Sequence, residues 1–284
     1  MKARAAILPL FLFLAACADE TTRRTEDAPI EIPALVEADA FSGGNAYAHC
    51  ARICELGPRP SGSEAYEHQL QYLEEHLQKA GWTATRQKFT LTDGTPMTNL
   101  HATFGEATGA RPLLITCHID TKRLPDFIGA DDGASGAAVI LELARMLART
   151  PELAAKVEFA FYDGEESFAG RMNLRNSLYG SRYDVAVRQA TGTLPRWQIN
   201  LDMVGGNNKI IAPPVLDSDL ELLDHYERAT EALGYSEHRW TIHPGTYLDD
   251  HTPFVNAGVA TLNLIAQFSG SNWWHPTRDT MQRI

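Results

Sequence analysis

Residues 157–166 read Val-Glu-Phe-Ala-Phe-Tyr-Asp-Gly-Glu-Glu. The first six residues, rich in aromatic and β-branched side chains, predict a buried strand, and Asp163-Gly164 predicts the turn that ends it. Ligands of open α/β sheets bind at the carboxyl ends of the strands. Two adjacent carboxylates at such an end, Glu165 and Glu166, are costly to bury unless a cation holds them. Taken alone, the pair fits a solvated helix start at least as well.

The same arrangement recurs along the chain, because several other apolar runs lead to a His or a carboxylate. These runs, each with its polar end, are 112–117 with His118-Ile119-Asp120, 198–201 with Asp202, and 259–265 leading towards Trp274-His275. Segments with helical character precede or separate these apolar runs, over about 36–56, 137–149 and part of 167–189. In a further predicted helix, Ser61 or Ser63 is the candidate cap and Tyr66, Leu70, Leu73 and Leu77 form the core face. Residues 82–91 and 97–104 predict a hairpin, and 209–212 and 238–242 predict short strands. Strands that alternate with helices predict an α/β fold, with a mostly parallel mixed central sheet covered by helices on both faces.

The N-terminal segment predicts export rather than part of the fold. Lys2 and Arg4 precede a short apolar region, which is typical of a signal peptide and too short to span a bilayer. Leu14-Ala15-Ala16-Cys17 resembles a bacterial lipobox, although an ordinary signal cleaved after small residues is an alternative. We therefore predict a signal peptide with a lipobox over 1–17, a polar tether over 18–33 and one catalytic domain over 34–284. The expected location is the periplasm or the cell surface of a bacterium, as a lipoprotein.

Composition and charge narrow the function classes. The chain has 284 residues, of which 44% are hydrophobic and 21% charged, so it is long enough for one large core. Its formal net charge of −11 gives no electrostatic support for nucleic-acid binding, and the only membrane contact we expect is the lipid anchor. Cys50 and Cys54 lie four residues apart on a predicted helix, and Cys117 lies in a predicted strand. Neither a disulfide framework nor a cysteine metal site is expected.

The residues at the predicted strand ends suit a catalytic zinc site. Histidine and carboxylate side chains offered from separate strands are hard and borderline ligands without thiolates. In His118-Ile119-Asp120, the carboxylate is placed to accept the second N–H of a metal-bound imidazole. Glu165 is then a candidate proton shuttle and Glu166 a candidate ligand. The small residues of 129–136 are expected to let the backbone approach other elements closely.

These motifs resemble the zinc aminopeptidases of the bacterial secreted type. The matching stretches are His118-Ile119-Asp120, 129–136 (Gly-Ala-Asp-Asp-Gly-Ala-Ser-Gly), Asp163-Gly164-Glu165-Glu166, Asn200-Leu201-Asp202 and His275. Within that family the chain is most similar to the animal-type glutaminyl cyclases. The stretches that carry this similarity are 118–122, 161–168, 176–182, 249–254 and Trp274-His275. Ser177-Leu178-Tyr179-Gly180-Ser181-Arg182 and Asp249-Asp250-His251-Thr252-Pro253-Phe254 distinguish this branch from the aminopeptidases.

The resemblance implies a zinc-exopeptidase-like fold and a glutaminyl-peptide cyclotransferase that acts on peptides or proteins with an N-terminal Gln. One zinc ion would polarise the γ-carboxamide carbonyl while the α-amine attacks it and ammonia leaves. The implied zinc ligands are Asp132, Glu166 and His275. Glu165 would be the general acid and base, Asp202 and Asp249 would form a carboxylate relay with it, and Trp274 would wall the substrate pocket.

Besides the cyclase, the sequence leaves two other functions open. A zinc aminopeptidase of the same fold would bind a second zinc ion through His118 and Asp202, with Asp132 bridging the two. Leu248, which stands where the cyclases carry Gln, and the aminopeptidase-like residues 133–136 keep this alternative open. A catalytically silent binding protein is the third reading, which the intact ligand set and Glu165 disfavour. The resemblance also implies a further C-terminal helix after Ile284, so we expect a truncated end.

Overall fold

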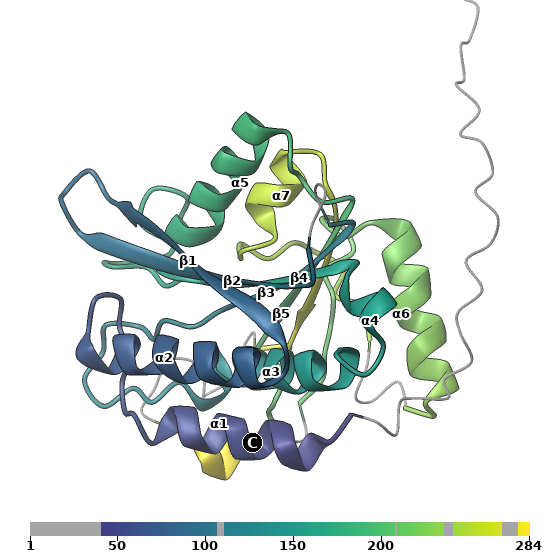
Figure 1. Ribbon diagram of the computed structural model, residues 1–284, viewed down its shortest axis with the longest axis horizontal. Coiled ribbons are helices and arrows are strands. Elements are labelled where there is room, and N and C mark those ends of the chain that lie inside the picture. The colour runs from purple at the N-terminus through teal and green to yellow at the C-terminus, as the bar shows by residue number, and fades with distance from the viewer. Residues whose placement is uncertain (1–40, 107–110, 208, 236–240, 269–277) are drawn as a thin grey trace, which may run out of the picture. The chain divides into compact units, whose positions relative to one another are not determined.

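Six strands form one central sheet in the order β1-β2-β4-β3-β5-β6 (Figure 1). The computed structural model describes residues 41–106, 111–207, 209–235, 241–268 and 278–284, which all lie in the unit Asp39–Ile284. The strands are β1 (Trp82–Thr90), β2 (Pro96–Phe104), β3 (Leu113–His118), β4 (Val157–Tyr162), β5 (Trp197–Asp202) and β6 (Ala260–Ile265). β3, β4, β5 and β6 are parallel, whereas β2 pairs antiparallel with both β1 and β4. The predicted mixed, mostly parallel sheet is therefore confirmed.

The register of the parallel strands brings their carboxyl ends to one edge of the sheet. His118 pairs with Tyr162 across β3 and β4, and Asp202 pairs with Ile265 across β5 and β6. These strands are short apolar runs because helices bury both of their faces. Each polar residue at a strand end is consequently held beside the loops that follow the neighbouring strands.

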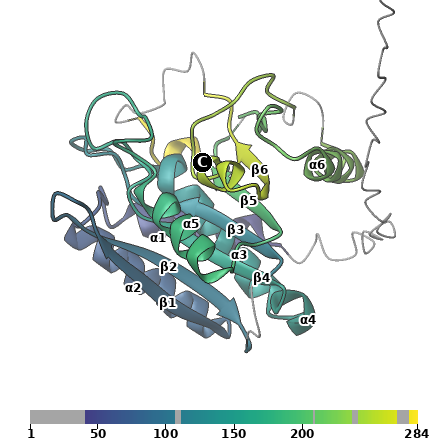
Figure 2. The same ribbon diagram turned by 90° about the horizontal axis from the view of Figure 1, so that it is seen from above.

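Helices cover both faces of this sheet. They are α1 (Gly43–Cys54), α2 (Glu64–Lys79), α3 (Gly136–Leu147), α4 (Pro151–Ala154), α5 (Tyr179–Thr191), α6 (Leu220–Ala232) and α7 (Thr252–Asn256), with a π-helical turn η2 (Ala130–Ser135) and a 3₁₀ turn η3 (Met281–Arg283). Figures 1 and 2 show α1, α2 and α3 along one face and α5 and α7 along the other, as predicted. α6 packs against β6.

α2 illustrates how the sequence pattern produces this packing. Its apolar residues recur every three or four positions, so Tyr66, Leu70, Leu73 and Leu77 fall on one face and are all buried in the core. Ser63 begins the helix, because its Oγ accepts a hydrogen bond from the backbone N–H of Tyr66 at 3.1 Å. The predicted cap and core face are both present.

Several predicted boundaries differ from the observed ones. The helix expected over 36–56 begins at Gly43, where the Ser42 side chain accepts from the backbone of Asn45. Within 167–189 the helix begins only at Tyr179, and the preceding residues form hydrogen-bonded turns. The short strand expected over 209–212 is reduced to one β-bridge, between Ile211 and Ala266. The strand expected over 238–242 lies largely outside the described residues.

The structure also bears on the cysteines and on the membrane-spanning character of the chain. Among the described residues, Cys50, Cys54 and Cys117 are free thiols. Over the described ranges, no helix has the length and apolar character needed to cross a membrane. The predicted signal peptide, lipobox and tether precede residue 41 and lie outside the described residues.

Candidate active site

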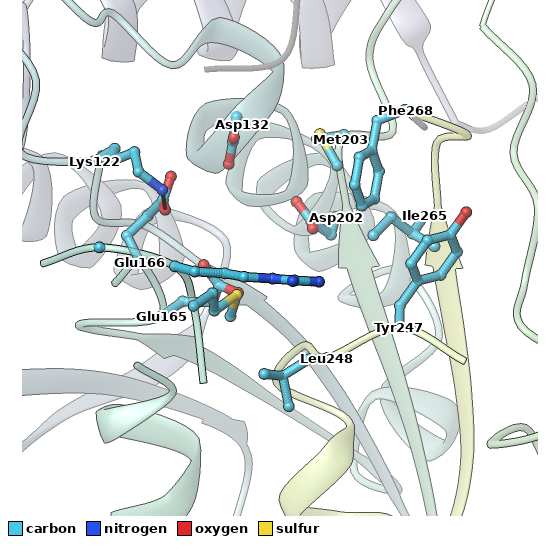
Figure 3. Close-up of a pocket in the computed structure, with 13 residues that line it drawn as sticks. Lys122, Asp132, Glu165, Glu166, Asp202, Met203, Tyr247, Leu248, Ile265 and Phe268 are labelled. Atoms are coloured by element: carbon cyan, nitrogen blue, oxygen red, sulfur yellow. Dashed lines mark hydrogen bonds and ion pairs between the residues drawn. The ribbon is translucent and has the colours of Figure 1, made fainter. Parts of the chain in front are cut away.

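A cavity of about 480 Å³ opens at the carboxyl edge of the sheet. Its acidic lining residues are Asp132, Glu165, Glu166 and Asp202, and the apolar ones include Met203, Tyr247, Leu248, Ile265 and Phe268 (Figure 3). The carboxylates come from η2, from the loop after β4 and from the end of β5. The structure therefore gathers at one cavity four of the residues that the sequence predicts as ligands or catalytic groups.

A histidine and two carboxylates form a potential metal-binding group beside this cavity. One donor atom each from His118, Asp132 and Asp202 lies within 4.8 Å of the others, and all three residues are buried. The Nε2 atom of His118 is 3.2 Å from Asp132 Oδ1 and 3.3 Å from Asp202 Oδ1. This is the set that the sequence suggests for a second metal, with Asp132 shared.

The turn that carries Asp132 depends on close packing of small residues. Within η2, Asp132 and Gly133 depart from helical geometry, and Gly133 has a φ of 104°. A Cβ atom at Gly133 would lie 2.8 Å from the carbonyl oxygen of Asp120, and one at Gly136 would lie 2.6 Å from that of Leu201. The predicted close backbone approach is confirmed, and it fixes the Asp132 carboxylate opposite the end of β3.

Asp120 acts mainly on the loop after β4. Its Oδ1 accepts a hydrogen bond from the backbone N–H of Glu165 at 3.0 Å, and its Oδ2 accepts one from that of Glu166 at 3.4 Å. The Nδ1 atom of His118 is closer to the backbone oxygen of Asp120, at 3.1 Å, than to its Oδ1, at 3.7 Å. Residue 120 therefore orients the imidazole chiefly through its carbonyl group, while its carboxylate positions the two glutamates.

Glu165 and Glu166 are adjacent but have different surroundings. Burial raises the pKa of Glu165 well above its usual range; His118 opposes this shift, and the carboxylates of Glu166, Asp249 and Asp250 add to it. The Oε2 atom of Glu166 instead lies 3.1 Å from Lys122 Nζ. A carboxyl group with a raised pKa can take up and return a proton near neutral pH, which suits Glu165 to proton transfer.

Asp202 and Asp249 influence each other across the site without a direct hydrogen bond. Burial, followed by the charge of Asp249, raises the pKa of Asp202 well above its usual range. The Asp249 carboxylate accepts from Asn263 Nδ2 at 2.8 Å and from the backbone N–H of Asp250 at 2.5 Å. Glu165 and Asp202 each interact with the charge of Asp249, and the relay and the catalytic roles of its members stay a prediction. Trp274 and His275 lie outside the described residues.

The two stretches typical of the cyclase branch hold the glutamate loop in place. Backbone N–H groups of Leu178, Tyr179 and Gly180 donate to the carbonyls of residues 165, 164 and 163, at 3.1, 2.9 and 2.9 Å. A Cβ atom at Gly180 would lie 2.6 Å from the Asp163 carbonyl oxygen, so a larger residue does not fit. The Oγ atom of Ser181 donates to Asp250 Oδ1 at 2.5 Å. The first stretch thus joins the glutamate loop to the second.

The family model that describes peptidase family M28 matches residues 99–284. The chain belongs to this family. Among M28-type relatives, it is 29% identical over 278 residues to the glutaminyl-peptide cyclotransferase of Gloydius blomhoffii, an alignment that covers 82% of this chain and 73% of that one. It is 30% identical over 263 residues to the glutaminyl-peptide cyclotransferase-like protein of Mus musculus, with 78% and 66% covered.

Solved structures support the same placement within the M28 fold. The glutaminyl cyclase of Porphyromonas gingivalis superposes with a TM-score of 0.79 at 30% identity, over 87% of this chain and 93% of that one. A leucine aminopeptidase precursor from Bacteroides thetaiotaomicron superposes with a TM-score of 0.76 at 25% identity, over 86% and 91%. The zinc-exopeptidase-like fold and the resemblance to glutaminyl cyclases, both predicted from the motifs, are confirmed.

A buried chain of hydrogen bonds that the sequence analysis missed leads through this M28 sheet to Asp249. Gln198 donates to Thr116 Oγ1 at 2.6 Å, Thr116 to Asn200 Oδ1 at 2.7 Å, and Asn200 to Asn263 Oδ1 at 3.1 Å. Asn263 then donates to Asp249. Each hydrogen bond is donated in the direction of Asp249, so the bonds polarise one another. Asn263, the last donor, is therefore a strong donor to the Asp249 carboxylate. The available signal was the set of polar residues inside otherwise apolar strands.

Asp279 is a second residue that the sequence analysis missed. Its Oδ1 accepts from the backbone N–H of Asp131 at 2.9 Å, and its Oδ2 accepts from that of Asp132, also at 2.9 Å. Burial and the nearby charge of Asp132 raise the pKa of Asp279 to about 6. Asp279 follows His275 by four residues, so it joins the segment after that histidine to the turn that carries Asp132. That spacing was its only sequence signal.

Proposed function

We propose that this protein is a zinc-dependent glutaminyl-peptide cyclotransferase, which converts the N-terminal Gln of peptides to pyroglutamate and releases ammonia. The observation that carries the proposal is the position of Glu165. This buried carboxyl group with a raised pKa lines the same cavity as Asp132 and Glu166. The similarity to glutaminyl cyclases from animals and from a bacterium supports cyclisation over other reactions of the fold.

The residues present fit a zinc ion. Asp132 and Glu166 offer carboxylate oxygens to one cavity, and His275, which the resemblance implies as the third ligand, would complete a site of oxygen and nitrogen donors. Such a site leaves one position open for substrate. When bound, zinc would supply Lewis-acid polarisation of the substrate γ-carboxamide.

The proton transfers fall to the side chains of this chain. Glu165 would accept a proton from the substrate α-amine as that amine attacks the γ-carbonyl carbon. The same group would then return a proton to the departing ammonia, so no water is consumed. Burial keeps the pKa of Glu165 high, and the charges of Glu166, Asp249 and Asp250 add to the shift. Met203, Tyr247 and Phe268 would shield the folded Gln side chain from water.

The direct test is a comparison of two substrates on the purified protein. Ammonia release from a peptide with an N-terminal Gln is expected, together with loss of 17 Da from the peptide, the mass of the ammonia. Hydrolysis of leucine anilide is expected to be slow or absent. Rapid anilide hydrolysis without ammonia release would contradict the proposal.

A zinc aminopeptidase is the second candidate, and one observation favours it. The donor atoms of His118, Asp132 and Asp202 lie within 4.8 Å of one another, an arrangement that a second metal would need. Glu165 would then activate a water molecule for hydrolysis.

Replacement of Asp279 by Asn tests whether this residue positions Asp132. The amide would present a donor to one of two buried backbone N–H groups and leave that group unpaired. Zinc affinity is therefore expected to fall by about 10–100-fold, the range for outer-shell partners of metal ligands. A competition titration with a chromophoric chelator measures it. Asp219→Asn, at the N-cap of α6, is the matched control, and equal affinities in both variants would contradict the role.

Membrane anchoring is a separate proposal, which rests on Leu14-Ala15-Ala16-Cys17 and the polar residues that follow. We propose that the protein is exported and carries a lipid on Cys17 at the periplasmic or outer cell surface of a bacterium. Cys17→Ser is expected to abolish lipid attachment and to move the protein from the membrane fraction or block its processing. Mass spectrometry of the mature N-terminus decides the question, since an unmodified N-terminus beyond residue 17 would exclude the anchor.

A further inference from the structure

Basic side chains gather beside the active-site cavity of this acidic protein. Lys122 and Arg171 line the cavity itself. The segments 121–128 and 167–182, the second of which runs into α5, contribute five basic residues, Lys122, Arg123, Arg171, Arg175 and Arg182, against the single acidic residue Asp126. We call these five side chains the basic rim. It stands out because the whole chain has a formal net charge of −11.

Aromatic contacts place the rim residues next to one another. The guanidinium of Arg123 lies 3.6 Å from the ring centroid of Phe168, and the rings of Phe168 and Tyr179 are 5.0 Å apart. Arg182 lies 5.9 Å from the centroid of Tyr179, whose hydroxyl donates to the carbonyl oxygen of Arg175 at 3.3 Å. The loops around residues 123 and 168–182 therefore form one continuous surface at the edge of the cavity.

The arginines of the rim are exposed and have no acidic partner in the described ranges. Among the described residues, Arg123, Arg171, Arg175 and Arg182 form no ion pair, and all four are exposed. Elsewhere on the described surface, Arg149, Arg278 and Arg283 are also unpaired, but four other arginines contact a Glu or Asp, namely Arg52, Arg86, Arg145 and Arg228. The positive charge of those four is neutralised within the protein. No carboxylate in the part of the chain that the structure describes pairs with Arg171, Arg175 or Arg182, so their positive charge is available to a ligand at the cavity.

The loop that carries Arg171 is also internally braced. Phe168 donates its backbone N–H to the carbonyl of Asn176 at 3.1 Å, and Asn176 Nδ2 donates to the carbonyls of Ala169 at 2.6 Å and Arg171 at 3.1 Å. A backbone held in this way fixes where the side chains of Arg171 and Arg175 begin, so less backbone conformational entropy is lost when they bind a ligand.

We propose that the basic rim selects peptide substrates that carry Asp or Glu at the second to fourth positions, after the N-terminal Gln. The inference rests on the proposed cyclase function and specifies its substrate class. With the Gln side chain in the cavity, the next three residues extend about 10 Å. The Debye length at physiological salt is about 8 Å, so the rim charges act on those of the three residues that pass close to Lys122 and Arg171 at the cavity. Carboxylates there would gain attraction on encounter and in the complex, and lysines would be repelled.

Three peptides that differ only in charge test the preference: Gln-Glu-Glu-Ala, Gln-Ala-Ala-Ala and Gln-Lys-Lys-Ala, all amidated at the C-terminus. At low ionic strength we expect kcat/KM for the acidic peptide to exceed that for the basic one by about 10-fold, chiefly through KM. In about 0.5 M NaCl the ratio should approach one. Ammonia release, measured at several substrate concentrations, gives both constants.

Reversing the charge of rim arginines tests whether the rim causes the preference for acidic peptides. Arg171→Glu and Arg175→Glu together are expected to remove or invert the ratio between the acidic and basic peptides. Arg228→Glu on α6, outside the residues that line the cavity, should leave it unchanged, and thermal melting of each variant checks folding. Equal kcat/KM for all three peptides in the unaltered protein would overturn the inference and leave the cyclase function standing. Absence of ammonia release from every peptide would overturn both.

Discussion

Glu165→Gln is expected to lower ammonia release from Gln peptides by about 10²–10⁴-fold, the usual contribution of a general acid and base. The substitution keeps the shape of the side chain but removes the group that exchanges a proton with the amine and the leaving ammonia. Zinc content, measured by inductively coupled plasma mass spectrometry on the dialysed protein, should stay the same. Glu165 is not a proposed zinc ligand, since those are Asp132, Glu166 and His275. The rate should fall through kcat rather than KM.

Glu166→Gln is the matched comparison, since it makes the same chemical change one residue later. The structure already separates the two positions: burial and nearby carboxylates raise the pKa of Glu165, whereas Glu166 lies 3.1 Å from the ammonium of Lys122. Glu166→Gln should weaken zinc binding, and excess zinc should restore part of its activity. An equal loss of zinc from both variants would show that the assigned roles are wrong.

The sheet, and the clustering of the site residues at one edge of it, could be predicted from the apolar runs in the sequence. Each apolar run that the sequence predicted as a buried strand is one, and parallel pairing alone brings the residues after β3, β4 and β5 to a single edge. Glu165, Asp202 and His118 were therefore recognisable as neighbours from the sequence pattern. Their proximity is a consequence of topology, which periodic hydrophobicity encodes well.

The residues that support the site were not predictable in the same way. Asp279 holds the turn around Asp132 through backbone N–H groups, and Asn263 reaches Asp249 from a neighbouring strand. Such contacts depend on loop conformation and on side-chain direction, neither of which leaves a periodic pattern. For the same reason, the sequence predicted that Asp120 lies beside His118 but not that it binds the glutamate loop. Its proximity to His118 is local in sequence, but its carboxylate binds the backbone of a loop 45 residues away.

Removal of zinc is expected to abolish cyclisation completely. A strong chelator should reduce ammonia release to the background rate, and stoichiometric Zn²⁺ should restore it. The reason is that the attacked γ-carboxamide is a poor electrophile, so Glu165 alone supplies only the proton-transfer part of the acceleration. His275→Ala should mimic the chelator, because it removes the nitrogen ligand shared by the cyclase and aminopeptidase proposals. Full activity in protein shown to be free of metal would contradict zinc dependence.

The number of zinc ions then separates the two proposed reactions. A single ion held by Asp132, Glu166 and His275 leaves Asp202 free to act with Glu165 and Asp249, as cyclisation requires. Two ions would use Asp202 and His118 as ligands and place a water molecule for hydrolysis. We expect one zinc per chain, and we expect His118→Ala to retain it, because His118 would not be a ligand. Two zinc ions in the unaltered protein, falling to one in His118→Ala and accompanied by rapid anilide hydrolysis, would assign the aminopeptidase reaction instead.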